Sequence, residues 1–441
     1  FQLPALADQR LTVVVSPLIA LMKDQVDALE IVGVASAALN SSLSSEEEQA
    51  VFEQLRSGRL RLLYVSPERL LTPSTLQLLR EADEGRGPAR FAIDEAHCIS
   101  AWGHDFRPEF RQLSKIKETF PGVPIQAFTA TATPRVQKDI AVQLRLERPR
   151  LFVGVFDRPN LTYRVVAKED KLSSILETIR RYPDEGAIVY CLSRANTETL
   201  AKALVKNGIP AVAYHAGLAA EDRKKISEDF AQERTNVVVA TIAFGMGIDR
   251  ANVRCVIHDS MPKSMEGYVQ ETGRAGRDGM PSECLLMYSA GDLIRLKRFF
   301  RDMDESTRHH HEALLEEVRR FAQSTQCRHQ ALSRYFGQNY DLPEEGCGAC
   351  DVCLGAFTPV PDGDEQSRRI LRALLEVEAK GRTCGVAFLS EVLVGKTTKT
   401  VQARGGDQLA EYGAIRGEQK QRVTLWISLL IEMGLIEVTS G

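Results

Sequence analysis

The chain has 441 residues, of which 44% are hydrophobic and 26% are charged, and its formal net charge at pH 7 is −3. That length predicts about three domains, and the small net charge excludes a uniformly basic chain, so any nucleic-acid binding requires local basic surfaces. Because no apolar run reaches the roughly 18–20 residues that span a bilayer and the first six residues lack a basic signal region, we expect an intracellular, cytoplasmic protein with no membrane partner.

Short apolar runs alternate with polar helical stretches through the first 290 residues, which is typical of parallel βα units. Helices are expected at residues 45–57 and 221–231, and the proline and turn residues at 157–160 indicate a joint between two lobes. The fold class is therefore α/β. Strands are expected at residues 11–15, 62–65, 91–93, 125–128, 187–190, 211–214, 237–240 and 256–258.

The character of the chain changes after residue 288. Residues 291–325 are charged and helical, and a cysteine cluster follows them. Residues 358–364 include two prolines and are typical of a linker. We expect a compact helical unit from 367 to 438 that ends in short β-like runs.

Two adjacent acids follow the apolar run 91–93. Asp94 and Glu95 begin the sequence Asp-Glu-Ala-His, which His97 completes, and all three are catalytic candidates. An apolar run ending in two carboxylates favours a buried parallel strand that brings both to the carboxyl edge of a sheet. There, one carboxylate can hold Mg²⁺ on nucleotide phosphates while the other orients the attacking water. The alternative is a solvated acidic turn, because such pairs are common.

A segment rich in aromatic and cationic residues comes directly after the acid pair. It contains Trp102, His104, Phe106 and Arg107. Bases stack on aromatic rings, and a cation among them can follow phosphates. The segment therefore predicts a sensor of single-stranded nucleic acid next to a nucleotide site.

Residues 94–110 resemble motif II and the aromatic-rich loop of the RecQ family of superfamily 2 DNA helicases. The resemblance implies two RecA-like parallel-sheet lobes, a helical zinc-binding subdomain and a winged-helix domain, at residues 1–157, 158–290, 291–358 and 359–441. It also implies an ATP-dependent, Mg²⁺-requiring enzyme that moves 3′ to 5′ and unwinds DNA in replication, recombination and repair. The implied partners are single-stranded DNA, duplex DNA and ATP. A single-strand-binding protein is a further partner that the resemblance allows, and association with the nucleoid is the implied location.

Several polar loops after apolar runs resemble DNA-contacting motifs of the same family. Ser16 with Pro17 predicts a capped helix N-terminus, which can bind a phosphate, and residues 64–69 repeat the pattern. Each alone would more often be a plain helix cap. Residues 127–133 resemble motif III, although they would suit an edge strand equally well. The further DNA-binding candidates are Ser193, Arg194, Thr241 and Met246.

Glycines and arginines in the second half of the α/β region complete the expected ATP site. Residues 239–249 resemble motif V, in which Gly247 and Asp249 are nucleotide-binding candidates. Residues 268–279 resemble motif VI and contain Gln270, Arg274 and Arg277. The two arginines are three residues apart, so on one face of a helix they could reach a common phosphate. Arg277 is the expected arginine finger and Arg274 a second phosphate contact; the alternative is an exposed basic helix end.

Four cysteines have the spacing of a metal site. Cys327, Cys347, Cys350 and Cys353 predict a tetrahedral structural Zn²⁺ site with no open position, whereas isolated core cysteines are the alternative. His329 is expected on a helix surface rather than as a ligand. In the winged-helix region, Lys396, Lys399 and Arg404 are expected to contact duplex DNA.

Two rival functions follow from the same residues. The resemblance places the family's phosphate loop just before Phe1, so we expect the 441 residues alone to bind ATP poorly. A catalytically inactive DNA-binding or strand-annealing fragment is therefore one alternative, although the intact acids and arginines argue against it. An RNA helicase is the other, but it would not be expected to carry the cysteines and the winged helix.

Overall fold

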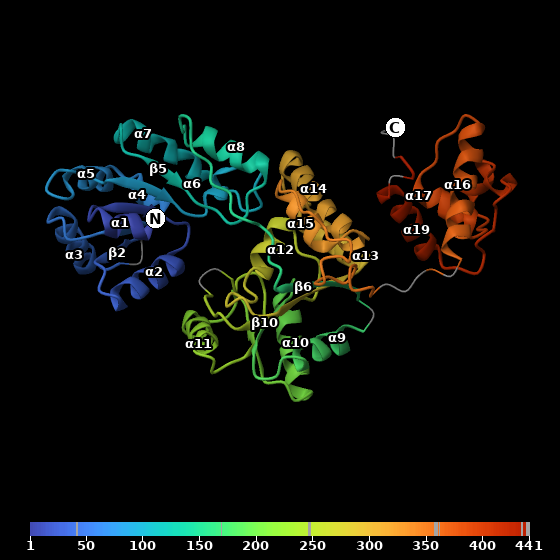
Figure 1. The fold of residues 1–441 in the computed structure, drawn as a ribbon, viewed down its shortest axis with the longest axis horizontal. Helices are drawn as coiled ribbons and strands as arrows, with labels where there is room; N and C mark the ends of the chain where they lie inside the picture. The colour runs from blue at the N-terminus through green and yellow to red at the C-terminus, as the bar shows by residue number, and fades with distance from the viewer. Residues whose placement is uncertain are drawn as a thin grey trace. The chain divides into compact units, whose positions relative to one another are not determined.

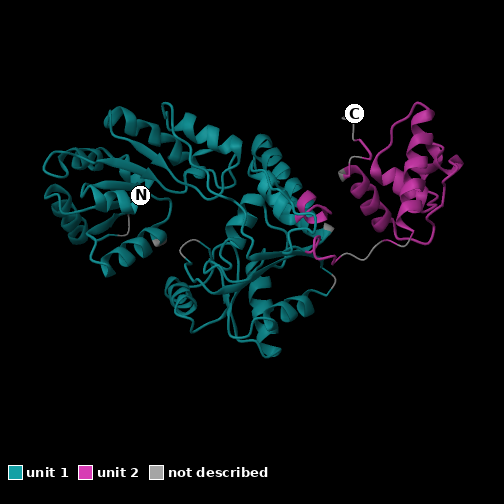
Figure 2. Cartoon of the chain, in the orientation of Figure 1, with its two compact units in different colours: residues 1–319, 328–350 teal, residues 320–327, 351–441 magenta. Residues whose placement is uncertain are grey.

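The computed structural model describes residues 1–40, 43–168, 170–245, 248–356, 360, 362–433 and 435–437. The chain forms two compact units (Figure 2). Unit 1 comprises residues 1–319 and 328–350, and unit 2 comprises residues 320–327 and 351–441. Within the described ranges, every helix is too short or too polar to cross a membrane.

The first sheet of unit 1 has five parallel strands in the order β2-β3-β1-β4-β5. Val15, at the end of β1, pairs with Val65 on one side and Ile93 on the other, so these strands end level with one another. The strands are β1 (Thr12–Val15), β2 (Ser36–Leu39), β3 (Leu62–Val65), β4 (Arg90–Ile93) and β5 (Ile125–Ala127). The helices around it, in blue to cyan in Figure 1, are α1 (Gln2–Ala7), α2 (Ile19–Ile31), α3 (Ser45–Arg56), α4 (Pro67–Leu70), α5 (Pro73–Glu81), α6 (Pro108–Arg111), α7 (Lys115–Thr119) and α8 (Pro134–Gln143).

Both faces of this sheet are covered, which explains its continuous apolar strands. Alternate residues of each strand enter different cores: Val13 and Val15 belong to one, and Val14 belongs to the other with Met22 and Leu29 of α2. A sheet that is buried on both sides exposes functional groups only at its edges. The polar residues that follow β1, β3 and β4 therefore lie at the carboxyl edge.

The second sheet has six parallel strands in the order β6-β11-β10-β7-β9-β8. Tyr190 pairs with both His258 and Ala240, so the central strands again end together. The strands are β6 (Leu161–Ala167), β7 (Gly186–Tyr190), β8 (Ala211–Tyr214), β9 (Val237–Ala240), β10 (Val253–His258) and β11 (Ser282–Tyr288). The accompanying helices are α9 (Lys171–Arg180), α10 (Arg194–Lys206), α11 (Ala220–Ala231) and α12 (Met265–Thr272).

Helices follow this sheet, and then a loop returns to it. The helices are α13 (Ala290–Phe299), α14 (Glu305–Gln323) and α15 (Arg328–Tyr335). The returning loop reaches the outer strand β6, where the amide of Tyr163 donates to the carbonyl oxygen of Ala349 over 3.0 Å and Tyr163 bridges to Cys350. The loop thus continues the second sheet beyond its edge strand.

Unit 2 contains α16 (Gly363–Ala379), α17 (Val386–Leu393), α18 (Lys399–Ala403) and α19 (Lys420–Glu432). Trp426 is 8% exposed and lies in a core with Ile370, Leu393 and Ile427. The indole is a packing residue, as its apolar neighbours in the sequence indicate. The expected terminal β-like runs do not appear in the described residues 435–437.

All eight expected strands are present, with ends within one residue of the sequence prediction except at β10, which begins three residues earlier than expected. Strands β2, β6 and β11 were not expected. The bounds of the four expected domains remain a prediction, since the division into two compact units does not test them.

Candidate active site and nucleic-acid interface

The acid pair lies at the carboxyl edge of the first sheet, as expected. The Asp94 amide donates to the Val15 carbonyl oxygen over 2.8 Å and thereby extends the ladder by one residue. Glu95 then adopts a left-handed backbone with φ 47°, which is uncommon for a residue with a side chain. The reversal ends the strand and turns the chain into the short 3₁₀ helix at Ala96–Ile99.

The two carboxyl groups differ in proton affinity. Burial, and then the neighbouring charge of Glu95, raise the pKa of Asp94 to about 6. Burial alone would also raise the pKa of Glu95, but a hydrogen bond and the charge of His97 outweigh it and lower that pKa. Two half-buried acids that repel each other are a suitable donor set for a divalent cation such as Mg²⁺.

His97 connects the acid pair to two other segments. Its Nδ1 lies 3.2 Å from Glu95 Oε2 and 3.0 Å from Thr129 Oγ1, in the segment after β5. Its ring stacks on His104 of the aromatic loop, with centroids 4.8 Å apart and planes at 14°. His97 is almost fully buried, so a displacement at either contact would be transmitted to the imidazole.

His104 links the loop to the segment expected to provide the arginines. Burial together with the charge of His97 lowers its pKa to about 4, against an opposing interaction with Gln270 of α12. The imidazole is therefore neutral at physiological pH. Gln270 thus lies close enough to His104 to act on its proton affinity.

Arg274 and Arg277 do not lie on one helical face, as the spacing had suggested. Helix α12 ends at Thr272, and both arginines occupy the turn that follows it. Arg274 is 6% exposed, donates to the Gly245 carbonyl oxygen, and contributes to the lowered pKa of Glu95. Arg277 is at the surface, where its Nη1 lies 2.5 Å from Asp249 Oδ1. The helical expectation was wrong because glycines 273 and 276 favour a turn.

The aromatic loop is fixed at its base and open at its tip. Ser100 Oγ donates to Asp139 Oδ2 of α8 over 2.6 Å and accepts from the Trp102 amide over 3.2 Å. The side chains of Trp102 and Phe106 are 44% and 37% exposed. Gly103 is required there, since a Cβ would lie 2.9 Å from the His97 carbonyl oxygen.

Arg107 is partly engaged within the protein. Its Nη1 donates to the Pro17 carbonyl oxygen over 3.2 Å, and it pairs with Asp105 at 3.3 Å. These contacts hold the end of the loop close to the residues that follow β1.

Of the loops expected to contact DNA, the one at Ser16 is built differently. Ser16 does not cap a helix: its amide bonds to the Val65 carbonyl oxygen over 3.1 Å, and α2 begins only at Ile19 with Leu18 as N-cap. Ser16 therefore continues the hydrogen bonding between β1 and β3, and the helix begins later than it would if Ser16 capped it. Ser66 does cap α4, accepting from the Arg69 amide over 3.4 Å with Pro67 at the first helical position.

The expected contacts in the second half of unit 1 are only partly described. Ser193 caps α10 by accepting from the Asn196 amide over 3.2 Å, and the exposed Arg194 lies against Gly217. The Thr241 amide donates to the Tyr214 carbonyl oxygen over 3.1 Å just after β9. The candidates Met246 and Gly247 lie outside the described residues.

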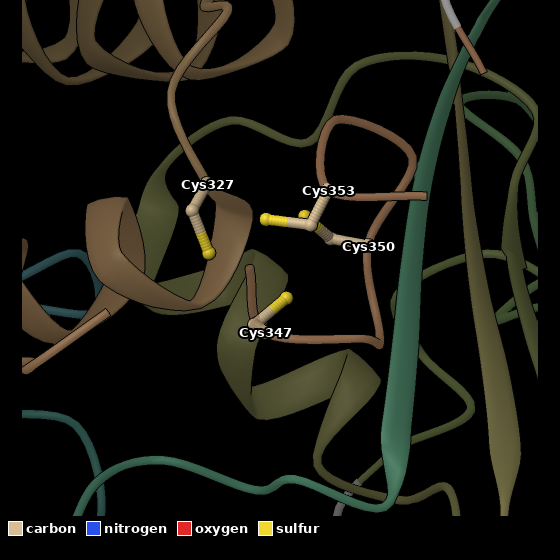
Figure 3. A group of neighbouring side chains, drawn as sticks. All are labelled: Cys327, Cys347, Cys350 and Cys353. Carbon is tan, nitrogen blue, oxygen red and sulfur yellow. The ribbon is translucent and has the colours of Figure 1, made fainter. Parts of the chain in front are cut away.

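The four predicted cysteines come together, as Figure 3 shows. The sulfur atoms of Cys327, Cys347, Cys350 and Cys353 all lie within 4.8 Å of one another. Sulfurs bound tetrahedrally at about 2.3 Å would be about 3.8 Å apart, so small shifts would suffice. Four thiolates that leave no open position fit a structural Zn²⁺ ion.

His329 was expected at a helix surface, and that expectation was wrong. The side chain is 1% exposed, with Nδ1 2.5 Å from Asp157 Oδ1 and Nε2 3.1 Å from the Ala349 carbonyl oxygen. It is not among the four ligands but holds the loop that carries three of them. No feature of the sequence predicted this contact, because it joins residues 172 positions apart.

In unit 2, Lys396, Lys399 and Arg404 are all exposed, between α17 and the end of α18. Arg404 also packs over the Phe388 ring at 4.7 Å and donates to the Thr383 carbonyl oxygen over 2.6 Å. The two lysines thus present exposed cationic groups, while Arg404 also stabilises the fold.

Sequence reasoning missed two residues that support the arginine-bearing segment. Tyr335 of α15 donates to Glu266 Oε1 of α12 over 2.8 Å. Asn160 donates to the Gly276 carbonyl oxygen over 2.9 Å. Gly276 has φ +55°, and a Cβ there would lie 2.5 Å from Asn160 Nδ2. Both contacts join distant segments, so no local pattern indicates them.

Comparison with known proteins covers nearly the whole chain. Family models match as "DEAD/DEAH box helicase" over residues 1–140, "Helicase conserved C-terminal domain" over 167–279, "RecQ zinc-binding" over 290–354 and "RQC domain" over 360–441. The ATP-dependent DNA helicase RecQ of Pasteurella multocida is 40% identical over 99% of this chain and 68% of its own length. The protein of the same name from Bacillus subtilis is 36% identical over 100% of this chain and 73% of its own length.

Solved structures agree in fold. Saccharomyces cerevisiae Dbp5 bound to RNA and ADP BeF3 has a TM-score of 0.51 at 16% identity, covering 72% of this chain and 85% of that one. The DUF1998 helicase MrfA bound to DNA has a TM-score of 0.54 at 19% identity, covering 68% and 43%. These likenesses show two RecA-like lobes. The sequence matches add a zinc-binding region and an RQC (winged-helix) region. The family uses ATP and Mg²⁺, and the zinc-binding region with its four cysteines is a site for Zn²⁺. The chain therefore belongs to the RecQ family of ATP-dependent DNA helicases.

Proposed function

We propose that this protein moves 3′ to 5′ along single-stranded DNA and separates duplexes, with strand occupancy switching on ATP hydrolysis. The observation that carries this proposal is the continuous contact from Glu95 through His97 to His104 of the aromatic loop. A base that stacks on the exposed part of the loop would act on a buried network ending at the acid pair. The same contacts argue against a catalytically inactive fragment.

Roles for individual residues follow from burial and charge. Asp94, with its raised pKa, would hold Mg²⁺, which supplies charge neutralisation at the phosphates. Glu95, whose lowered pKa keeps the carboxylate ionised, would orient the attacking water and receive its proton. Buried Arg274 would stabilise phosphate charge from the second lobe, and surface Arg277 would act as the finger on leaving Asp249.

Family membership supports the wider assignment. We propose that the enzyme acts in replication, recombination and repair at the nucleoid, with a single-strand-binding protein among its partners. Polarity is tested on duplexes with a single 3′ or 5′ tail. Separation of only the 3′-tailed substrate is expected, and equal activity on both would contradict the assigned direction.

Coupling is tested at the tip of the loop. In the full-length protein, Trp102→Ala and Phe106→Ala should each lower DNA-stimulated ATP turnover on the order of tenfold, as the loss of one stacked base would predict. DNA-independent turnover and ATP binding should change little. ATPase assays with and without oligo-dT provide the measurement. Equal loss of basal and stimulated rates would show that the loop does not couple the two sites.

A further inference from the structure

Helix α8 holds the aromatic loop at two points. Arg135 and Asp139 are four residues apart and therefore lie on one face of the helix. Asp139 accepts from Ser100 at the base of the loop over 2.6 Å. The Arg135 guanidinium carbon lies over the Trp102 ring, 3.3 Å from its centroid. One face of α8 thus contacts both the base of the aromatic loop, at Ser100, and its tip, at Trp102.

The position of Arg135 is not explained by its helix. It occupies the first turn of α8, after the N-cap Thr133, where a positive charge is disfavoured by the helix dipole. Among the described residues, none forms an ion pair with it. The interaction that the structure gives for the Arg135 guanidinium is its contact with the Trp102 indole.

This contact competes with the function assigned to Trp102. Each face of an indole accepts one stacked partner, and the guanidinium already covers one face. The ring of His310 in α14 meets the same indole edge to face, with centroids 6.0 Å apart. A base that stacks on the covered face must first displace Arg135.

We propose that Arg135 is a positioning residue that restrains Trp102 against α8 until DNA displaces it, and so sets the DNA concentration needed to activate the enzyme. The proposal rests on the function assigned above, since it assumes that Trp102 senses DNA. Helix α8 suits this role because its N-cap Thr133 follows Thr129, which contacts His97. The residue that restrains Trp102 and the residue that contacts His97 therefore both lie in the segment 129–135.

The contact can be measured without any activity. The chain has two tryptophans, so Trp426→Phe leaves Trp102 as the sole reporter. On this background, Arg135→Ala should increase acrylamide quenching of Trp102 in DNA-free protein, and Arg135→Lys should give an intermediate value. Arg111→Ala is the matched control, because Arg111 makes the same kind of contact, at 4.8 Å, with Phe106 of the same loop. If Trp426→Phe disturbs unit 2, subtracting the emission of a Trp102→Phe variant isolates the same signal.

The functional readout is the oligo-dT concentration that gives half-maximal ATPase stimulation. Arg135→Ala should lower it roughly 2- to 5-fold, the factor that corresponds to about 0.5–1 kcal/mol for an exposed cation–π contact. Unchanged quenching, or an unchanged or increased activating concentration, would overturn the restraint. Failure of the proposed function is distinguishable: Trp102→Ala would then leave DNA stimulation intact, while quenching would still report the Arg135 contact.

Discussion

Glu95 combines a left-handed backbone, partial burial and a lowered pKa. The left-handed backbone and the burial of a charge each cost folding free energy, whereas the interactions that lower the pKa stabilise the ionised carboxylate at the end of the buried strand. Such a group is ionised at neutral pH, so it can orient the attacking water and receive its proton as well as bind a cation. This role separates it from Asp94, whose pKa is shifted the other way.

Replacing Glu95 by Gln tests this role. The amide keeps the shape of the side chain but cannot take a proton, so ATP turnover should fall on the order of 10²–10⁴-fold. Binding of ATP and DNA should be preserved. Steady-state ATPase and equilibrium binding are compared with Glu109→Gln, a partly buried acid next to the loop. Near-normal turnover in Glu95→Gln would move the role to another residue.

His104 makes the stability of unit 1 depend on pH. In the folded protein its pKa is about 4, below the ordinary value near 6.5 for an unfolded chain. As pH falls below 6.5, the unfolded chain gains a proton that the folded chain refuses, so stability is lost down to about pH 4.

Between pH 7.5 and 5.0 the loss should be about 2 kcal/mol, and His104→Gln should remove most of it. Thermal or denaturant unfolding at the two pH values provides the measurement. His309→Gln is the control, since it removes an exposed histidine that does not contact His97 or the aromatic loop in the described residues. A variant at His104 with the parental pH profile would show that other groups are responsible.

Residues whose role is set by neighbours in the sequence were predictable, and those set by distant contacts were not. Asp94 and Glu95 could be placed because the preceding strand is apolar. Ser16 could not, because the competing partner is Val65 of another strand. The burial of Arg274 likewise depends on Gly245, which is remote in sequence.

At the scale of elements, the sequence did not predict strands that lack β-branched residues or that contain a charged residue. β2 has the sequence Ser-Ala-Ala-Leu, which contains no β-branched residue. β11 carries the buried Glu283, whose charge is balanced by Arg164 and Arg181. These partners lie on β6 and after α9, so only the folded chain shows why an acid is tolerated there.

The cysteine cluster gives an element-scale prediction. Cys350→Ser should reduce bound zinc well below the roughly one ion per chain that a closed site holds. It should also greatly destabilise the surrounding loop, because structural zinc contributes on the order of 10–16 kcal/mol in small modules. Elemental analysis and limited proteolysis measure the two effects. Cys384→Ser, a half-buried cysteine outside the cluster, should retain the metal. A metal-free but protease-resistant Cys350→Ser protein would contradict a structural role.

On the scale of the whole molecule, unit 2 presents cations while unit 1 holds the acid pair and the aromatic loop. Binding of duplex and hydrolysis of ATP should therefore be separable. Because the overall charge of the chain is −3, the chain as a whole does not attract DNA, and its affinity for duplex DNA depends on local cations such as the lysines of unit 2.

The double variant Lys396→Ala, Lys399→Ala should weaken duplex binding and reduce the salt dependence of log K by about one for each phosphate that the protein no longer neutralises. ATPase stimulated by short single strands should be largely retained. Fluorescence anisotropy at several salt concentrations gives the slope. Lys380→Ala is the control, because Glu376 already neutralises that lysine at 2.9 Å. An unchanged slope in the double variant would exclude these lysines from the duplex interface.

The pairing of Tyr163 with Ala349 and Cys350 has a consequence for the protein outside its reaction. β6 is the outer strand of a six-stranded sheet, and an uncovered outer strand is a template on which other chains can aggregate. The loop that carries three of the cysteines pairs with this strand at Tyr163, so a metal that orders the loop would also help to protect this edge of the sheet. Depletion of zinc, for example during overexpression in metal-poor medium, should therefore favour intermolecular β-aggregates before it impairs unwinding.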